Sequence, residues 1–226
     1  MRHTFRNLLI VTMVALLMPL KVAFAEPNGL PQLTGQWWQW ALSIPPGVNP
    51  LNDDSGANCM IGQSGSTWFL AGTFGGAPVT RTCAVPADTE LFFPVVNSVW
   101  FNSPNICGQG AEDFTVKEMR GWVAAFFDQA ITMSVSLDGR EVKPLQHVVS
   151  QPFAVALPED NVFDAACAPF GGHPTGVFSP AVDEGYYVRL KPLSEGDHTL
   201  HIEAESAGGF AVDVTYNLTV VPVLKK

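Results

Sequence analysis

The sequence predicts a mainly β protein, an antiparallel β-sandwich of the immunoglobulin-like or jelly-roll-like kind, with one amphipathic helix packed on it and two disulfides. Three observations lead to this prediction. Segments of the C-terminal part alternate apolar and polar residues, one central segment has apolar residues at helical spacing, and four cysteines follow an N-terminal export signal. A strand with one wet face belongs to an antiparallel sheet, and such sheets bury their apolar faces against each other.

The export signal occupies residues 1–25. Arg2 and Arg6 precede an apolar run over 8–20, and a small-residue cleavage motif ends at Ala25. This is the pattern of a cleaved secretory signal peptide, and the run is too short to span a bilayer. We therefore expect a periplasmic or secreted protein with no membrane span after cleavage.

The charge balance excludes one class of partner. The chain has 12 Lys and Arg against 21 Asp and Glu, a formal net charge of −9 at pH 7. Because nucleic acid requires a basic face that neutralises phosphates, no nucleic-acid partner is expected. No Gly-rich segment matches a nucleotide-binding fingerprint, and no cofactor is expected.

The four cysteines are Cys59, Cys83, Cys107 and Cys167. An even count in an exported protein indicates two disulfides, for which three pairings are open. We favour Cys59–Cys83 and Cys107–Cys167, because each bond then closes a loop around a contiguous segment. The spacings contain no C-x-x-C, so neither a zinc site nor a redox centre is expected.

Residues 26–226 are predicted to form a single β-rich domain, since about 200 residues suit one domain of this class. Within it, 26–112 is a loop-rich, disulfide-bearing half, 113–130 is a helix and 131–226 is a half built from β-hairpins.

The loop-rich half begins with three tryptophans, Trp37, Trp38 and Trp40. They lie in a segment that forms either a helical turn or a strand and is stopped by Pro45 and Pro46. Three strands are expected after it, over 68–70, 79–85 and 89–100. Pro94 lies inside the last strand and indicates a sheet edge or a bulge, because proline donates no ladder hydrogen bond.

The helix over 113–130 is predicted from two signals. Thr115 and Glu118 fit a capping box, in which each side chain covers a free backbone N–H of the first turn. Apolar residues then recur at helical spacing and form one face. We expect Trp122 and Phe126 on this face to be buried against the sheet. The apolar face comprises Val116, Met119, Trp122, Val123, Phe126 and Phe127.

Two hairpins are predicted in the last part of the chain. Residues 133–137 alternate and lead into Asp138-Gly139, a pair typical of two-residue turns. Residues 200–205 and 210–220 alternate on either side of Gly208-Gly209.

A longer pattern also carries a resemblance. The segment GQSG at 62–65 is followed by WFLAGTFGG at 68–76 and RTCAVPADTELFFPVVN at 81–97. This pattern, GQ-x-G…WFLAG-x-x-GG…R-x-C-x-VP…LFFPV-x-N, resembles that of a family of exported bacterial proteins, and 185–204 looks like the matching end. The resemblance implies an exported, β-rich protein and brings no catalytic residue with it. The terminal hairpins also resemble those of immunoglobulin-like sandwiches.

Histidines and carboxylates give one candidate for catalysis. His173 lies in a loop near Cys167, with Asp183 and Glu184 downstream. A hydrolytic or metal-dependent site would need these side chains to converge, and only the fold could bring them together. His198 and His201 are three residues apart on a strand, so they point to opposite faces and cannot bind one metal together.

The tryptophan cluster gives a candidate for binding. Exposed Trp faces at Trp37, Trp38 or Trp40 would stack on sugar rings, whereas buried ones would anchor the core. Burial therefore discriminates a carbohydrate-binding module from the leading hypothesis. That hypothesis is an exported soluble protein with a non-catalytic binding or structural role, whose ligand could be a glycan or another exported protein. The hydrolase near His173 remains the second alternative.

Overall fold

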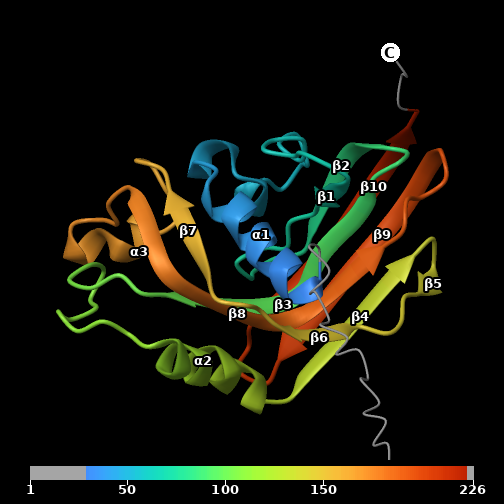
Figure 1. Ribbon diagram of the computed structural model, residues 1–226. Helices are drawn as coiled ribbons and strands as arrows, with labels where there is room; N and C mark the ends of the chain where they lie inside the picture. The colour runs from blue at the N-terminus through green and yellow to red at the C-terminus, as the bar shows by residue number, and fades with distance from the viewer. Residues whose placement is uncertain (1–28, 223–226) are drawn as a thin grey trace, which may run out of the picture.

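The computed structural model describes residues 29–222, and the expected signal peptide lies outside them. The described chain forms two five-stranded β-sheets (Figure 1). The first sheet has the order β1 (Thr67–Phe69), β3 (Glu90–Phe101), β8 (Gly176–Leu190) and β6 (Gln146–Val149), and β7 (Phe153–Leu157) also pairs with β8. The second sheet has the order β2 (Val79–Pro86), β10 (Ala211–Val221), β9 (Gly196–Ser206), β4 (Ile131–Leu137) and β5 (Arg140–Glu141). The prediction of a mainly β fold is confirmed.

Both sheets are mixed, so the predicted antiparallel sandwich also contains parallel pairs. β1 runs parallel to β3 and β2 runs parallel to β10, whereas β3–β8 and β9–β10 are antiparallel. Alternation along a strand reports which of its faces is wet, and it says nothing about the direction of a partner distant in the chain. β2 and β10 are joined by no hairpin turn that would fix their relative direction.

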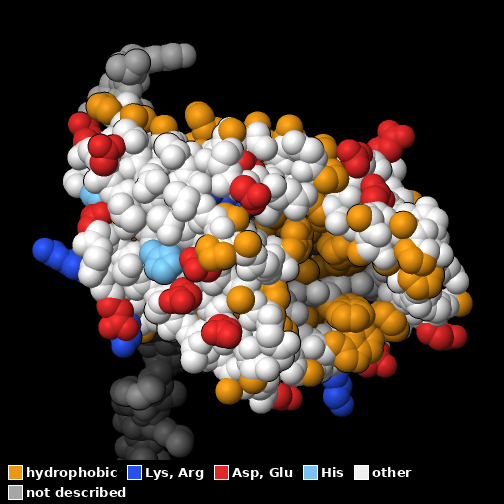
Figure 2. Space-filling view, turned by 180° about the vertical axis from the view of Figure 1, so that it is seen from behind, with side chains coloured by type: hydrophobic (Ala, Val, Ile, Leu, Met, Phe, Trp, Pro, Cys, Tyr) orange, Lys and Arg blue, Asp and Glu red, His pale blue; other side chains and the backbone are white. Residues whose placement is uncertain are grey.

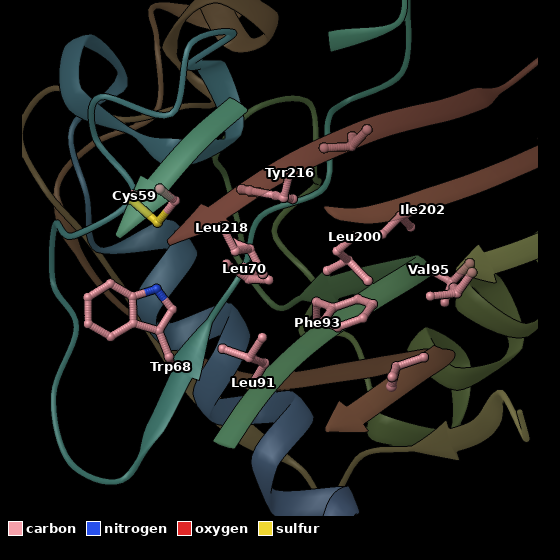
Figure 3. Close-up of a cluster of buried hydrophobic side chains, with 14 of the residues drawn as sticks. Cys59, Trp68, Leu70, Leu91, Phe93, Val95, Leu200, Ile202, Tyr216 and Leu218 are labelled. Atoms are coloured by element: carbon pink, nitrogen blue, oxygen red, sulfur yellow. A yellow bond between two sulfur atoms is a disulfide. The ribbon is translucent and has the colours of Figure 1, made fainter. Parts of the chain in front are cut away.

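The main hydrophobic core lies between the sheets. Figure 3 shows Phe93 of β3 next to Leu200 of β9, with Tyr216 and Leu218 of β10 close by. From Leu200 in β9, and throughout β10, every second residue is buried, as the alternation predicts. The hairpin joining these strands and the turn between β4 and β5 are confirmed.

Helix α1 (Leu30–Leu42) covers the opposite face of the first sheet and forms a third layer (Figure 1). The tryptophan segment is therefore a helix of 13 residues, longer than the single turn considered from the sequence. Its tryptophans pack against Phe92 of β3 and Tyr187 of β8 in a second hydrophobic cluster. The helix ends before Pro45, as proline requires.

Helix α2 (Val116–Ala125) begins at the predicted capping box of Thr115 and Glu118. Its buried face differs from the prediction. Met119 and Val123 pack on Val182 of β8, whereas Trp122 is 39% exposed. Phe126, also expected to be buried, is half-buried and begins the short helix η3 (Phe126–Asp128). The apolar stripe is wider than the surface that α2 meets, because α2 lies alone against the outer part of β8 and β3 rather than between layers (Figure 1).

The structure also tests the predictions for Pro94 and for the four cysteines. Pro94 lies at a bulge in β3, which is an interior strand and not an edge. The disulfides are Cys59–Cys83 and Cys107–Cys167, as favoured from the sequence.

Within residues 29–222, no helix has the length and apolar character needed to cross a membrane. Four short helical segments complete the structure: η1 (Pro46–Val48), η2 (Pro50–Asn52), α3 (Asp164–Cys167) and η4 (Ala168–Phe170).

Candidate functional site

The three tryptophans of α1 are buried, with 1% exposure at Trp37 and 6% at Trp38 and Trp40. Each indole N–H donates to a protein acceptor, respectively the carbonyl of Leu70, Asp183 Oδ1 and the carbonyl of Ile61. Their faces therefore contact the first sheet, and a sugar cannot stack on them. These side chains anchor the core.

The structure does not bring His173, Asp183 and Glu184 together. Asp183 faces α1, and its neighbour Glu184 points to the other face of β8, where its Oε1 lies 2.9 Å from Nε2 of His147. His173 lies in the loop between β7 and β8, among phenylalanine rings. Among residues 29–222, no three His, Cys, Asp or Glu side chains are grouped so as to hold a metal.

Asp183 is a buried carboxyl group with an unusual protonation equilibrium. The indole N–H of Trp38 and the hydroxyl of Tyr187 both donate to its Oδ1 at 2.7 Å. Burial nevertheless outweighs these hydrogen bonds and raises the pKa of Asp183 to about 7. A carboxyl group of this kind could serve in proton transfer. However, Asp183 is completely buried beneath α1, so a substrate would reach it only if the helix moved.

A Ser–His–Asp arrangement lies on the described surface, at residues that no sequence pattern marked as a site. Nδ1 of His198 lies 2.7 Å from Asp138 Oδ2, and Ser194 Oγ lies 3.3 Å from Nε2 of His198. The same Nε2 lies closer, at 2.9 Å, to the backbone carbonyl of Ser194. Because a carbonyl and a carboxylate both accept, each ring nitrogen carries a proton, and the hydrogen bond to Asp138 raises the pKa of His198. An imidazolium cannot take the proton of a serine, so this geometry fixes a loop rather than activating a nucleophile.

The described surface is hollowed by a groove of about 560 Å³ at the end of β3. Its walls are the end of β3, the loop over 102–115 and the loop over 158–175, and Figure 2 shows hydrophobic side chains around a hollow on this side of the molecule. The disulfide Cys107–Cys167 ties one loop to the other. We call this site the aromatic groove, after six of its lining residues: Trp100, Phe101, Phe114, Phe163, Phe170 and His173.

Polar side chains fix the loop over 102–115. Asn102 Oδ1 accepts from Gln109 Nε2 at 2.7 Å and from the backbone N–H of Phe114 at 2.9 Å. Gln109 Oε1 accepts from the backbone N–H of Ser103 at 2.8 Å. These bonds close the loop on itself and hold Phe114 at the groove.

A second set of bonds fixes the loop over 158–175. Asp164 accepts from the backbone N–H groups of Asn161 and His173, and these bonds hold the pKa of Asp164 below its usual value. The Asn161 side chain donates to the carbonyl of His173 at 2.8 Å. His173 is thus held by its backbone on both sides.

The imidazole of His173 is 4% exposed and lies among the rings of Phe101, Phe163 and Phe178. Its Nδ1 lies 3.2 Å from the carbonyl of Pro174 and therefore donates. Its Nε2 is buried and has no hydrogen-bond partner among the described residues. In the neutral tautomer that this donation selects, Nε2 is an acceptor. A buried acceptor without a partner costs about 1–3 kcal/mol, which a ligand that donates a hydrogen bond would recover.

Comparison of the chain with known protein families, curated proteins and solved structures finds no match. The groove must therefore be interpreted from its own chemistry. His173 was a candidate from the sequence, but its aromatic neighbours in the groove were not. The available signal was the disulfide between Cys107 and Cys167, since each of these cysteines lies in a loop that also carries aromatic residues.

Proposed function

We propose that this protein is exported and binds, without converting it, a small ligand in the aromatic groove. The observation that carries the proposal is an apolar groove of about 560 Å³ between two loops that a disulfide joins. Ligand sites in proteins typically have volumes of about 300–1,000 Å³, apolar walls and few polar groups. The two disulfides support export to the periplasm or beyond the cell, where such bonds persist.

The polar groups at the groove support binding rather than catalysis. Ser103 Oγ donates to Gln109 Oε1 at 3.3 Å, so its proton is directed away from the imidazole of His173. Cys107 and Cys167 are consumed in the disulfide and supply no thiolate. A nucleophile with an adjacent base, which covalent catalysis needs, is not assembled from these groups.

A glycan is the second candidate ligand. The tryptophans that would bind it are not the three of α1 that the sequence suggested. Trp100, which lines the groove, and Trp122, which packs on Trp100, are 43% and 39% exposed, and their ring centroids lie 4.9 Å apart. Exposed aromatic faces of this kind could stack on a sugar ring. An oligosaccharide therefore belongs in the test.

The test is a binding screen on the mature protein. The probes are 2-naphthol, a medium-chain fatty acid, 1-anilinonaphthalene-8-sulfonate and cellohexaose, each measured by thermal shift and by calorimetric titration. A ligand that binds the native state raises its apparent stability. We expect at least one probe to bind, and Phe170→Ala to weaken it at least fivefold because Phe170, 62% exposed, contributes the open rim of the groove.

Phe74→Ala is the matched control, since Phe74 is 51% exposed and lies outside the groove. It should leave the affinity unchanged. If no probe binds, or if Phe170→Ala and Phe74→Ala bind every probe like the wild type, the groove is not a binding site and the proposal fails.

A further inference from the structure

The lining of the aromatic groove contains no Asp, Glu, Lys or Arg. A charged ligand would lose its hydration there and gain no charged partner in return, which disfavours its binding. The ligand that fits is therefore uncharged, although the protein as a whole has a formal net charge of −9.

Aromatic rings line the groove from three separate segments. Phe101 ends β3, Phe114 lies in the first loop, and Phe163 and Phe170 lie in the second. Rings pack best edge-to-face or offset against another flat ring, and such pairs stabilise a complex beyond the apolar area that they bury. A flat aromatic ligand uses these walls better than a flexible chain, which loses more conformational entropy on binding.

Among its polar side chains, the groove offers a ligand a hydrogen-bond acceptor rather than a donor. Gln109 is occupied on both sides of its amide, because Oε1 accepts from Ser103 while Nε2 donates to Asn102 and to the carbonyl of Glu112. His173 Nε2 has no partner and acts as an acceptor. His173 is also far more buried than Phe170, which is exposed at the groove. Any group that reaches this nitrogen forms a hydrogen bond with it only by donating.

We propose that the aromatic groove takes an uncharged aromatic compound bearing a hydroxyl group, with its ring among the aromatic walls and its hydroxyl donating to Nε2 of His173. This inference rests on the proposed function and specifies its ligand class. Ligands of the same size that lack the donor, or that carry a charge, bind more weakly.

The experiment compares three naphthalenes near neutral pH by calorimetric titration: 2-naphthol, 2-methoxynaphthalene and naphthalene-2-carboxylate. They share the ring and differ in the donor and the charge. We expect 2-naphthol to bind about tenfold more tightly than the methyl ether, which corresponds to one hydrogen bond. The carboxylate should bind at least tenfold more weakly than 2-naphthol.

His173→Phe keeps a ring of similar shape and removes the acceptor. It should abolish the preference for 2-naphthol over its methyl ether. His201→Phe is the matched control, because His201 lies on β9 beside Asp213 and away from the groove, and it should keep the full preference. In the wild type, a second measurement needs no substitution. The ¹⁵N resonance of His173 Nε2 should shift on adding 2-naphthol and stay in place on adding the ether.

The outcomes separate the two proposals. Equal affinity for 2-naphthol and its ether, tighter binding of the carboxylate, or an unmoved Nε2 resonance would overturn the ligand class while leaving a binding groove. Failure of every probe, including those of the broader screen, would overturn the proposed function itself.

Discussion

Asp183 couples the stability of the protein to pH. Burial raises its pKa to about 7, from an ordinary aspartate value of 3.8. Between these two values the folded protein keeps a proton that the unfolded chain releases, so the free energy of unfolding falls as pH rises. The contribution is complete below the unfolded pKa and lost above about pH 7. With about 1.4 kcal/mol per pKa unit, the loss is on the order of 4 kcal/mol.

Asp183→Asn should remove this dependence. The amide oxygen can still accept from Trp38 and Tyr187, and the side chain stays uncharged at every pH. Urea denaturation at several pH values between about 4 and 7.5 is the measurement. We expect the variant to become progressively more stable than the wild type as pH rises. Parallel stability curves for the two proteins would show that Asp183 ionises normally.

The pKa of His198 should lie above 6.5, the ordinary value for histidine, because its hydrogen bond to Asp138 stabilises the imidazolium. The same bond lowers the pKa of Asp138. The pair therefore favours folding only while both groups are charged. This contribution is lost as pH rises through the raised pKa of His198 and as pH falls through the lowered pKa of Asp138.

An NMR titration of His198 in the wild type and in Asp138→Asn checks this. The substitution should lower the pKa of His198 toward its ordinary value. If His198 already titrates at or below 6.5 in the wild type, its imidazole is a free base near neutral pH. The serine beside it would then have to be reconsidered as a nucleophile.

At the scale of elements, the sequence predicts best the strands that have one buried face and one exposed face. β9 and β10 have one face in the core and one in water, so they alternate. The turn at Asp138-Gly139 is recognisable because both residues take positive φ, 51° and 72°. β8 is harder to predict from the sequence, because both of its faces are covered. α1 covers one face and the second sheet and α2 cover the other, so no regular alternation results. α1 is buried over most of its circumference, and its polar stripe is narrow, formed by Gln32, Gln36 and Gln39, so the helical spacing is easy to miss.

Helix α2 provides a direct test of the corrected packing. Met119 is completely buried, whereas Trp122 is partly exposed and contacts Trp100 and Phe114. Met119→Ala should lower the free energy of unfolding by about 2–5 kcal/mol. Trp122→Ala should lower it by less, on the order of 1 kcal/mol, because much of its surface stays in water in either state. Denaturant melts of both variants decide the matter, and a larger loss for Trp122→Ala would mean that the stripe is buried as the sequence indicated.

At the scale of the whole molecule, the aromatic groove arises where the layers end. The second sheet and α1 cover most of the first sheet, but β3 and β8 extend beyond them toward the two loops that carry the disulfide (Figure 1). The groove depends on the meeting of 102–115 with 158–175. Local patterns describe each loop alone, which is why His173 could be singled out from the sequence while its aromatic neighbours could not.

The two disulfides should therefore differ in what their loss does. Cys107–Cys167 spans 60 residues and Cys59–Cys83 spans 24. On the chain-entropy model their removal costs about 4 and about 3.5 kcal/mol, so both double Cys→Ser variants should be destabilised to a similar degree.

Only Cys107→Ser/Cys167→Ser should also lose affinity for the ligand of the aromatic groove, because only this bond joins its two loops. Calorimetric titration at a temperature where both variants remain folded measures the affinity. Alkylation of the denatured, unreduced wild type, followed by mass spectrometry, checks that no cysteine is free. An unchanged affinity in Cys107→Ser/Cys167→Ser would show that the polar side-chain bonds of Asn102, Asn161 and Asp164 hold the loops without the disulfide.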